Sequence, residues 1–276
     1  MPQQRTYEWL ARLGYAAHGC VYVIMGGLAV LAALGAGGRT TGAKGALLTL
    51  LSQPFGFALL GLVAFGLLCF SGWRLAQSIL DVDHLGNDGK ALGRRIAYGV
   101  SGVVHAALAF FATGVTFGLK AASSSDEQSV RDWTAYLFAA PFGRWLVGAI
   151  GLTIVAAGIG IASRGLTASF EKDLAVQWQA RRWIMPLGRL GFIARGLVFG
   201  IVGIFLVFAA LHADPGEARG LGGALRALQG QPFGRVVFGI TALGLFAFGL
   251  FQLAVAYYRR IDPSEVERVF HQRRAT

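Results

Sequence analysis

Six long apolar stretches constrain this chain more than any other feature of its sequence. Each has about 20 residues or more, the length that a helix needs to cross roughly 30 Å of hydrocarbon, and none alternates strictly as a barrel strand does. Hydrophobic residues make up 55% of the 276 residues and charged residues only 14%, against roughly a quarter charged in an ordinary soluble domain. We therefore expect an all-α membrane protein with six transmembrane helices, over residues 14–35, 55–79, 95–118, 142–165, 190–211 and 233–258.

Basic residues are distributed unevenly between the two ends of these stretches. Six crossings put both termini on one side, and most of the 25 lysines and arginines then fall on that side. Because translocating fewer cations is favoured, we expect both termini to be cytoplasmic. The net charge of +11 predicts membrane lipids as partners, through anionic headgroups at the cytoplasmic leaflet. Nucleic acid is not expected, because the basic residues lie between apolar stretches and form no single patch.

The chain repeats one helical pair three times. The first helix of each unit carries Arg-Leu-Gly-Tyr-Ala-Ala-His-Gly at 12–19, Arg-Ile-Ala-Tyr-Gly-Val-Ser-Gly at 95–102 and Arg-Leu-Gly-Phe-Ile-Ala-Arg-Gly at 189–196. The second helix opens each time with Pro-Phe-Gly, at 54–56, 141–143 and 232–234. This near-constant spacing predicts three repeat units and a basic tail, at residues 1–85, 90–175, 186–262 and 263–276.

Aligned residues of the repeats suggest how the helices begin and pack. A proline suits the first helical position, where a missing N–H costs nothing, so we expect it there in Pro54, Pro141 and Pro232. Small residues let a neighbouring helix approach closely, which predicts a packing stripe through Gly19, Gly102 and Gly196. A basic side chain at the start of a first helix suits pairing with lipid phosphate, which predicts that role for Arg12, Arg95 and Arg189.

The segments between the two helices of each unit are polar or mildly amphipathic. We expect short helices at the outer membrane interface over residues 45–51, 132–139 and 223–228. The polar run at 123–129 predicts an ordinary exposed loop.

The thrice-repeated Arg-Leu-Gly-Tyr…Gly pattern, followed each time by Pro-Phe-Gly, resembles the bacterial membrane family named domain of unknown function 1206. That family also has three tandem two-helix units, and the likeness covers nearly the whole chain. The resemblance implies a multi-pass protein of the bacterial inner (plasma) membrane. It supplies no activity and no catalytic residue.

Tandem units of two helices close most simply into a pseudo-threefold bundle, in which aligned positions form rings. Polar residues recur at such positions and make up the candidate ligand-binding set: His18, Ser101, Arg195, His105, Arg74 and Gln252. No Asp or Glu lies within the apolar stretches, so Arg74 and Arg195 lack an obvious intramembrane partner. Such arginines extend to the headgroups, form hydrogen bonds with carbonyls and water, or hold an anion.

Two functions fit these features. The first is binding or transport of a small anion or an anionic lipid through a cavity between the repeats. The second is a non-catalytic scaffold or accessory subunit, which would bind another membrane protein or a second copy through its Gly-rich helix faces. We expect no enzyme, cofactor or metal site, because no nucleophile–base pair or zinc spacing occurs. His18 and His105 occupy different repeat positions, which disfavours haem ligation.

Overall fold

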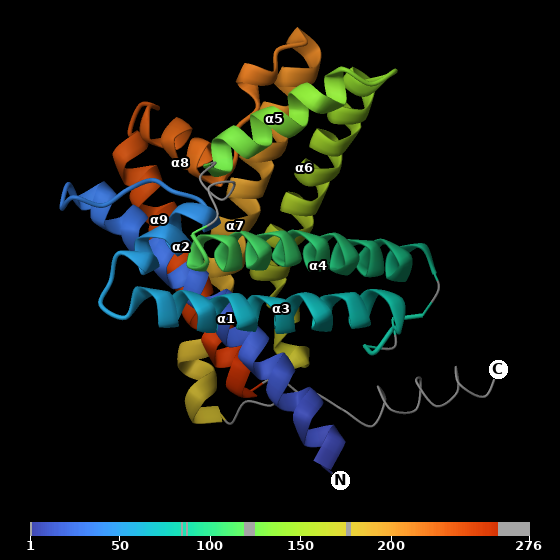
Figure 1. The fold of residues 1–276 in the computed structure, drawn as a ribbon, viewed down its shortest axis with the longest axis vertical. Coiled ribbons are helices and arrows are strands. Elements are labelled where there is room, and N and C mark those ends of the chain that lie inside the picture. Colours follow the sequence, from blue (N-terminus) through green and yellow to red (C-terminus); the bar gives the residue numbers. More distant parts are fainter. Residues whose placement is uncertain (1, 84, 87, 119–124, 175–177, 259–276) are drawn as a thin grey trace.

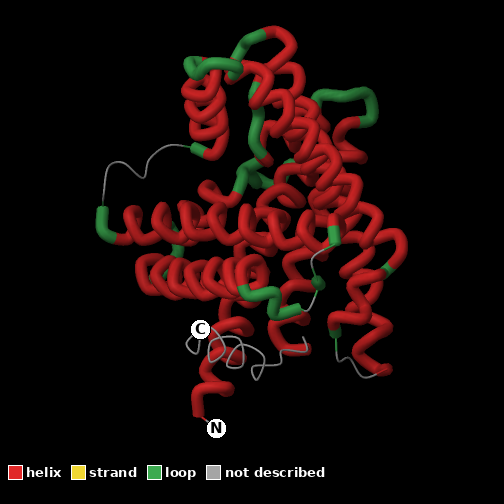
Figure 2. Tube along the Cα trace, turned by 90° about the vertical axis from the view of Figure 1, so that its right-hand side faces the viewer, coloured by secondary structure: helices red, strands yellow, loops and turns green. Residues whose placement is uncertain are grey.

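The computed structural model describes residues 2–83, 85–86, 88–118, 125–174 and 178–258, and within these ranges it consists of helices and loops (Figures 1 and 2). The first helices of the units are α1 (Pro2–Leu34), α4 (Gly89–Thr116) and α7 (Trp178–His212), and the second helices are α3 (Gly56–Ile79), α6 (Gly143–Thr167) and α9 (Gly234–Tyr258). Shorter elements are α2 (Ala43–Leu51), α5 (Asp126–Phe138), α8 (Leu221–Gln229) and the 3₁₀ turns η2 (Ser169–Asp173) and η3 (Pro215–Glu217).

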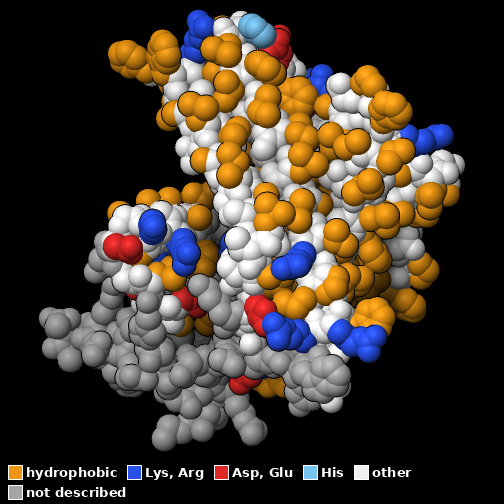
Figure 3. All heavy atoms as spheres, turned by 180° about the vertical axis from the view of Figure 1, so that it is seen from behind, with side chains coloured by type: hydrophobic (Ala, Val, Ile, Leu, Met, Phe, Trp, Pro, Cys, Tyr) orange, Lys and Arg blue, Asp and Glu red, His pale blue; other side chains and the backbone are white. Residues whose placement is uncertain are grey.

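All six long helices are long and apolar enough to cross a membrane, as predicted. Hydrophobic side chains cover much of the face seen in Figure 3. The predicted tail at 263–276 lies outside the described residues.

The long helices pack in the cyclic order that a threefold repeat requires. The second helix of each unit packs against the first helix of the next, α3 on α4 and α6 on α7, and α9 returns to pack on α1. The last pair joins the third unit to the first and gives the pseudo-threefold arrangement predicted from the repeats. Within units one and three the two helices also pack on each other, α1 on α3 and α7 on α9.

Unit two departs from this pattern, because its two helices are apart. Among the described residues, α4 and α6 make no contact with each other comparable to those of the other pairs. Figure 1 shows α3 and α4 side by side and lying across the direction of α6 and α7. Only 22% of the apolar stretch of α4 and 17% of that of α6 is buried, against 39–56% in the other four helices. The ring is therefore open on one side.

The aligned glycines make the contacts between units possible, as the sequence predicts. An added Cβ would meet the residue at one aligned position of the preceding unit's second helix: Gly19 meets Leu253 at 3.0 Å, Gly102 meets Leu75 at 2.8 Å and Gly196 meets Ala162 at 2.7 Å. Real Cβ atoms almost never come so close to a neighbour, so a larger side chain would separate the helices.

Contacts within a unit depend on a second small pair. In units one and three a Cβ added to the glycine of the second helix would lie 2.4 Å from the Cβ of an alanine on the first helix: Gly66 from Ala17 and Gly244 from Ala194. Unit two has Thr153 and Val100 at these positions, and both are exposed. The bulkier, β-branched pair removes the close contact and explains why this unit stays open.

The Pro-Phe-Gly motif forms a turn before each second helix, so the prediction that proline occupies the first helical position is wrong. The helices begin at the glycine, and the phenylalanine before it is left-handed, at φ 60° for Phe55, 60° for Phe142 and 59° for Phe233. The glycine amide donates across the turn, for example from Gly56 to the Gln53 carbonyl at 2.9 Å. A Cβ on Gly56 would come within 2.1 Å of the Leu51 carbonyl oxygen. The prolines Pro54, Pro141 and Pro232 thus set the turn rather than the first helical residue.

Two of the aligned arginines bind a helix end, where lipid phosphate was predicted. Arg95 donates from Nε to the Ser78 carbonyl at 2.9 Å, at the end of α3. Arg12 donates from Nη1 to the Ala256 carbonyl at 2.8 Å and to the Tyr257 carbonyl, at the end of α9. Unpaired carbonyls and the negative end of the helix dipole favour a cation at this position. Arg12 and Arg95 therefore stabilise the same contact between units that the aligned glycines form.

The segment predicted as an exposed loop contains the start of α5, and its acidic residues join the three short helices. Asp126 accepts from the Lys44 amide at 3.1 Å, in the first turn of α2. Glu127 accepts from the amides of Gly220 at 3.1 Å and Gly223 at 2.6 Å, at the start of α8. Burial raises the pKa of Asp126, although the backbone amides of Lys44 and Gly45 and the Lys44 ammonium lower it. The two carboxylates thus act as helix caps supplied by another unit.

One matched pair of substitutions on α7 tests the glycine contacts. A Cβ on Gly196 would lie 2.5 Å from the Gly158 carbonyl oxygen, whereas a Cβ on Gly200 meets nothing within 4 Å. We expect Gly196→Ala to destabilise the protein by about 1–3 kcal/mol through overpacking, and Gly200→Ala to be neutral or slightly stabilising. Thermal unfolding in detergent, followed by tryptophan fluorescence, measures both. Equal midpoints would contradict this packing.

Candidate functional site

His18 lies at the centre of the candidate site and is only 2% exposed. Its ring stacks on Phe70 of α3, with centroids 4.5 Å apart, and meets the edge of His105 of α4 at 4.9 Å. The Nε2 atom of Gln252 on α9 lies 2.8 Å from its Nδ1 atom. The site therefore gathers side chains from all three units.

The hydrogen bond from Gln252 decides which ring nitrogen of His18 carries a proton. An amide nitrogen only donates, so Nδ1 of His18 must accept, and a neutral imidazole then keeps its proton on Nε2. That Nε2 atom is buried and has no hydrogen-bond partner. A buried N–H without a partner is costly, because it has lost its water and gained nothing. His18 thus presents one unused donor to the centre of the bundle.

Arg74 is held between rings and amides near the end of α3. Its guanidinium lies 4.9 Å from the centre of the Phe70 ring and 5.0 Å from that of Tyr98 on α4. Nη1 donates to Oε1 of Gln77 at 3.2 Å, and Nε2 of Gln77 donates to Oδ2 of Asp83 at 2.7 Å. Its own Nε is buried and unpaired. A fully buried amide thus links Arg74 to a carboxylate just beyond the end of α3.

Arg195 on α7 is surrounded by aromatic rings. Its guanidinium lies 4.8 Å from the centre of Phe248, 5.2 Å from Phe199 and 5.6 Å from Tyr22. Such contacts are worth about 2 kcal/mol when desolvated, yet its Nε remains buried without a hydrogen-bond partner. Arg74 is near enough for Coulombic repulsion with it. Arg164 of α6, over the Phe192 ring at 5.2 Å, adds a third positive group within that range.

The structure therefore brings most of the predicted residues together. We call His18, Arg74, His105, Arg195 and Gln252 the basic cluster. Ser101 takes a different part: its carbonyl oxygen lies 2.6 Å from Nδ1 of His105, one turn along α4, so it orients that ring. Apart from Glu8 at the start of α1, the six long helices contain no Asp or Glu.

The predicted hollow between the first helices is filled by side chains. Phe70, Phe248 and Tyr22 are all buried around His18 and contact its ring. Sequence reasoning missed Phe70 and Phe248, since phenylalanines are common in any apolar stretch. The repeat alignment could have identified the two phenylalanines, because Phe70 and Phe248 occupy one aligned position, at which unit two has Ala157.

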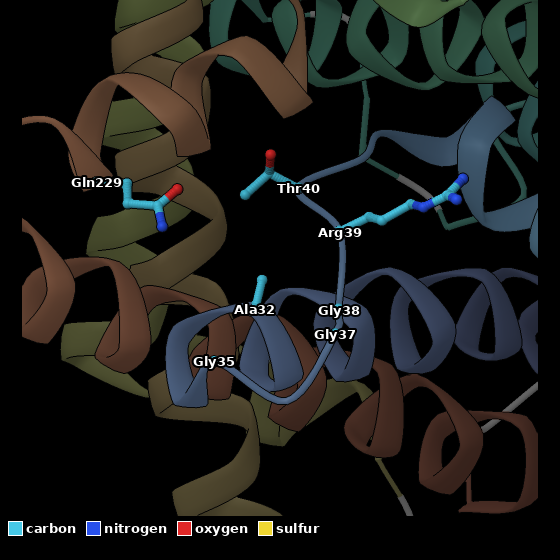
Figure 4. Close-up of a pocket in the computed structure, with 7 residues that line it drawn as sticks. All are labelled: Ala32, Gly35, Gly37, Gly38, Arg39, Thr40 and Gln229. Atoms are coloured by element: carbon cyan, nitrogen blue, oxygen red, sulfur yellow. The ribbon is translucent and has the colours of Figure 1, made fainter.

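A surface cavity of about 480 Å³ lies elsewhere, beside the loop that follows α1 (Figure 4). Its lining is mostly backbone from Gly35, Gly37 and Gly38, and Gln229 of α8 lies across from them. The Arg39 side chain points away from Gln229 in Figure 4. The cavity contains none of the predicted site residues.

Three tandem units of two apolar helices define a multi-pass membrane protein. The family described as Domain of Unknown Function (DUF1206) matches the chain three times in succession, at residues 13–81, 96–168 and 190–259, and the chain belongs to this family. The "Uncharacterized protein YxxB" of Bacillus subtilis (strain 168) is 35% identical over 265 residues, which cover 94% of each chain. No solved structure matches.

A double-mutant cycle tests the buried pair at the centre of the cluster. His18→Phe or Gln252→Leu alone leaves one buried polar partner unsatisfied and should cost about 1–3 kcal/mol. The double variant replaces both partners by apolar groups, so we expect it to be more stable than the sum of the single effects predicts. The free energies of unfolding in detergent measure the coupling. Strictly additive effects would show that the two side chains do not interact.

Proposed function

We propose that the basic cluster binds an anion, and that the anion is a phosphoryl group. The observation that carries this proposal is that Arg74 and Arg195 lie over Phe70 and Phe248, two rings that both contact His18, in a bundle whose long helices have no carboxylate beyond Glu8. Placing like charges together in a medium of low dielectric constant is unfavourable unless a counter-charge is present. Asp83 is linked to Arg74 through Gln77, and a bound anion would supply counter-charge for the rest of the cluster.

The donors of the cluster suit a group with several oxygens. Three buried N–H groups have no partner, and they belong to three different helices: Nε2 of His18, Nε of Arg74 and Nε of Arg195. Guanidinium groups match the geometry of phosphate oxygens and form charge-assisted hydrogen bonds with them. A phosphoryl group would accept hydrogen bonds from these three N–H groups, which have otherwise lost their hydration without gaining a partner.

Extension of both arginines to the headgroups explains the cluster less well. The Nε atoms are out of contact with solvent, and the guanidinium groups lie over Phe70 and Phe248 inside the bundle. The excess of lysine and arginine on the side of the termini supports an orientation with this end of the helices at the cytoplasmic leaflet. We restrict the proposal to binding, because buried aromatic side chains fill the space that a transport path would need.

The scaffold function required small-residue stripes that face the lipid. Gly19, Gly102 and Gly196 instead face the second helix of the preceding unit. Because these glycines pack against helices of the same chain, they are not available to bind another membrane protein, and we do not extend the proposal to a scaffold.

Native mass spectrometry of the purified protein tests the proposal. We expect Arg74→Ala and Arg195→Ala each to lower retention of an added phosphatidylglycerol or of inorganic phosphate by about tenfold, because a charge-assisted hydrogen bond contributes about 1.5–3 kcal/mol. Arg182→Ala is the control, because Arg182 is exposed and lies outside the cluster. Retention of both ligands at the parent level in both cluster variants would reject the site.

A further inference from the structure

The open side of the ring gives the basic cluster a route to the bilayer. The surface is hollowed between the block that contains α6 and the block that contains α3 and α4, at the left edge of Figure 3. Val100 on α4 and Thr153 on α6 occupy the positions that contact each other in units one and three, and both are exposed here. Other apolar side chains of both helices are exposed as well. We call the space between α4 and α6 the gap.

The gap adjoins the cluster on both sides. On α4, Tyr98 lies 5.0 Å beneath the guanidinium of Arg74. On α6, Arg164 lies over Phe192, whose ring packs against Phe248 beneath Arg195, and Arg164 is within Coulombic range of Arg195. Each wall of the gap therefore contributes a side chain next to one arginine of the cluster.

The residues that open the gap are those at which unit two departs from the repeat. In units one and three the phenylalanine of the second helix packs against a glycine of the first, where an added Cβ would lie 2.6 Å from the phenylalanine backbone: Gly14 against Phe70 and Gly191 against Phe248. Unit two has Ala97 and Ala157 there. Together with Val100 and Thr153, these changes remove both interlocking pairs that units one and three share.

We propose that an anionic phospholipid enters this opening sideways, with its phosphate against Arg74 and Arg195 and one acyl chain along the gap. This inference rests on the proposed anion site and names its ligand. The depth is suitable, because Arg74 is five residues from the end of α3, or about 7–8 Å along the helix axis. Charge and shape select the same occupant: cationic groups bind the phosphate, and the apolar walls suit a hydrocarbon chain.

A bound phospholipid, unlike free phosphate, needs the gap between α4 and α6. A free anion has no acyl chain and therefore needs no opening between α4 and α6. A lipid needs the opening for its chain. Changes that fill the gap and leave the arginines in place therefore separate the two sources.

Two variants close the gap in different ways. The first gives unit two the residues of units one and three: Ala97→Gly, Val100→Ala, Thr153→Gly and Ala157→Phe. The second, Val100→Trp, fills the gap directly and needs no movement of the helices. The control is Ile240→Ala with Leu243→Ala, two exposed apolar positions on α9, a helix that does not line the gap.

The experiment compares phosphatidylglycerol with inorganic phosphate. Each variant is incubated with vesicles of phosphatidylglycerol in phosphatidylcholine, extracted, and examined by native mass spectrometry, and phosphate binding is measured separately by calorimetry. We expect both closing variants to lose phosphatidylglycerol at least fivefold and to bind phosphate as the parent does, while the control retains both. Parent-level retention of phosphatidylglycerol in both closing variants overturns the inference. The anion site itself fails only if Arg74→Ala and Arg195→Ala leave both ligands bound.

Discussion

The close approach between the second helix of one unit and the first helix of the next is the contact on which the structure depends. Gly19, Gly102 and Gly196 leave no room for a side chain at this contact. In lipid no hydrophobic force drives helices together, so close packing of small residues has to hold them. Arg12 and Arg95 strengthen the same contact by capping the neighbouring helix end. Repeated in cyclic order, it joins the last helix to the first.

This cyclic packing also explains where the polar residues meet. His18, next to the aligned glycine of α1, and Gln252 on α9 form a hydrogen bond because α9 returns to α1. The first and last units thus complete one site, although 234 residues separate the two partners. Positive charge accumulates there without a carboxylate among the long helices, apart from Glu8 near the start of α1. The chemistry of the site follows from this imbalance.

Much of this architecture could be predicted from the sequence, because the signals were periodic and repeated. The length of the apolar stretches predicted the six helices, and the aligned glycines predicted the close contacts between units. The capping role of Glu127 could not be predicted, because its partners are amides of Gly220 and Gly223, far along the chain. Proline alone suggested a helix start, whereas the left-handed Phe55 after it moved the start by two residues.

The open unit was the feature that repeat reasoning missed. Three matching motifs suggested three equal hairpins, and the substitutions that distinguish unit two lie between the motif residues. Val100 and Thr153 are ordinary in a membrane helix and become informative only beside the Ala–Gly pairs of the other units. Whether the two helices of a unit pack together depends on the tertiary contact between these side chains and not on the local structural preference of either residue.

Disulfide trapping in native membranes tests the cyclic order most directly, in a chain whose Cys20 and Cys69 are replaced by alanine. The Ala33→Cys/Gly239→Cys pair joins α1 to α9, because a Cβ on Gly239 would lie 3.6 Å from that of Ala33. The account predicts rapid oxidation of this pair and none for Val100→Cys/Thr153→Cys, since a disulfide needs Cβ atoms about 3.5–4.5 Å apart. Cross-linking between α4 and α6, with none between α1 and α9, would contradict it.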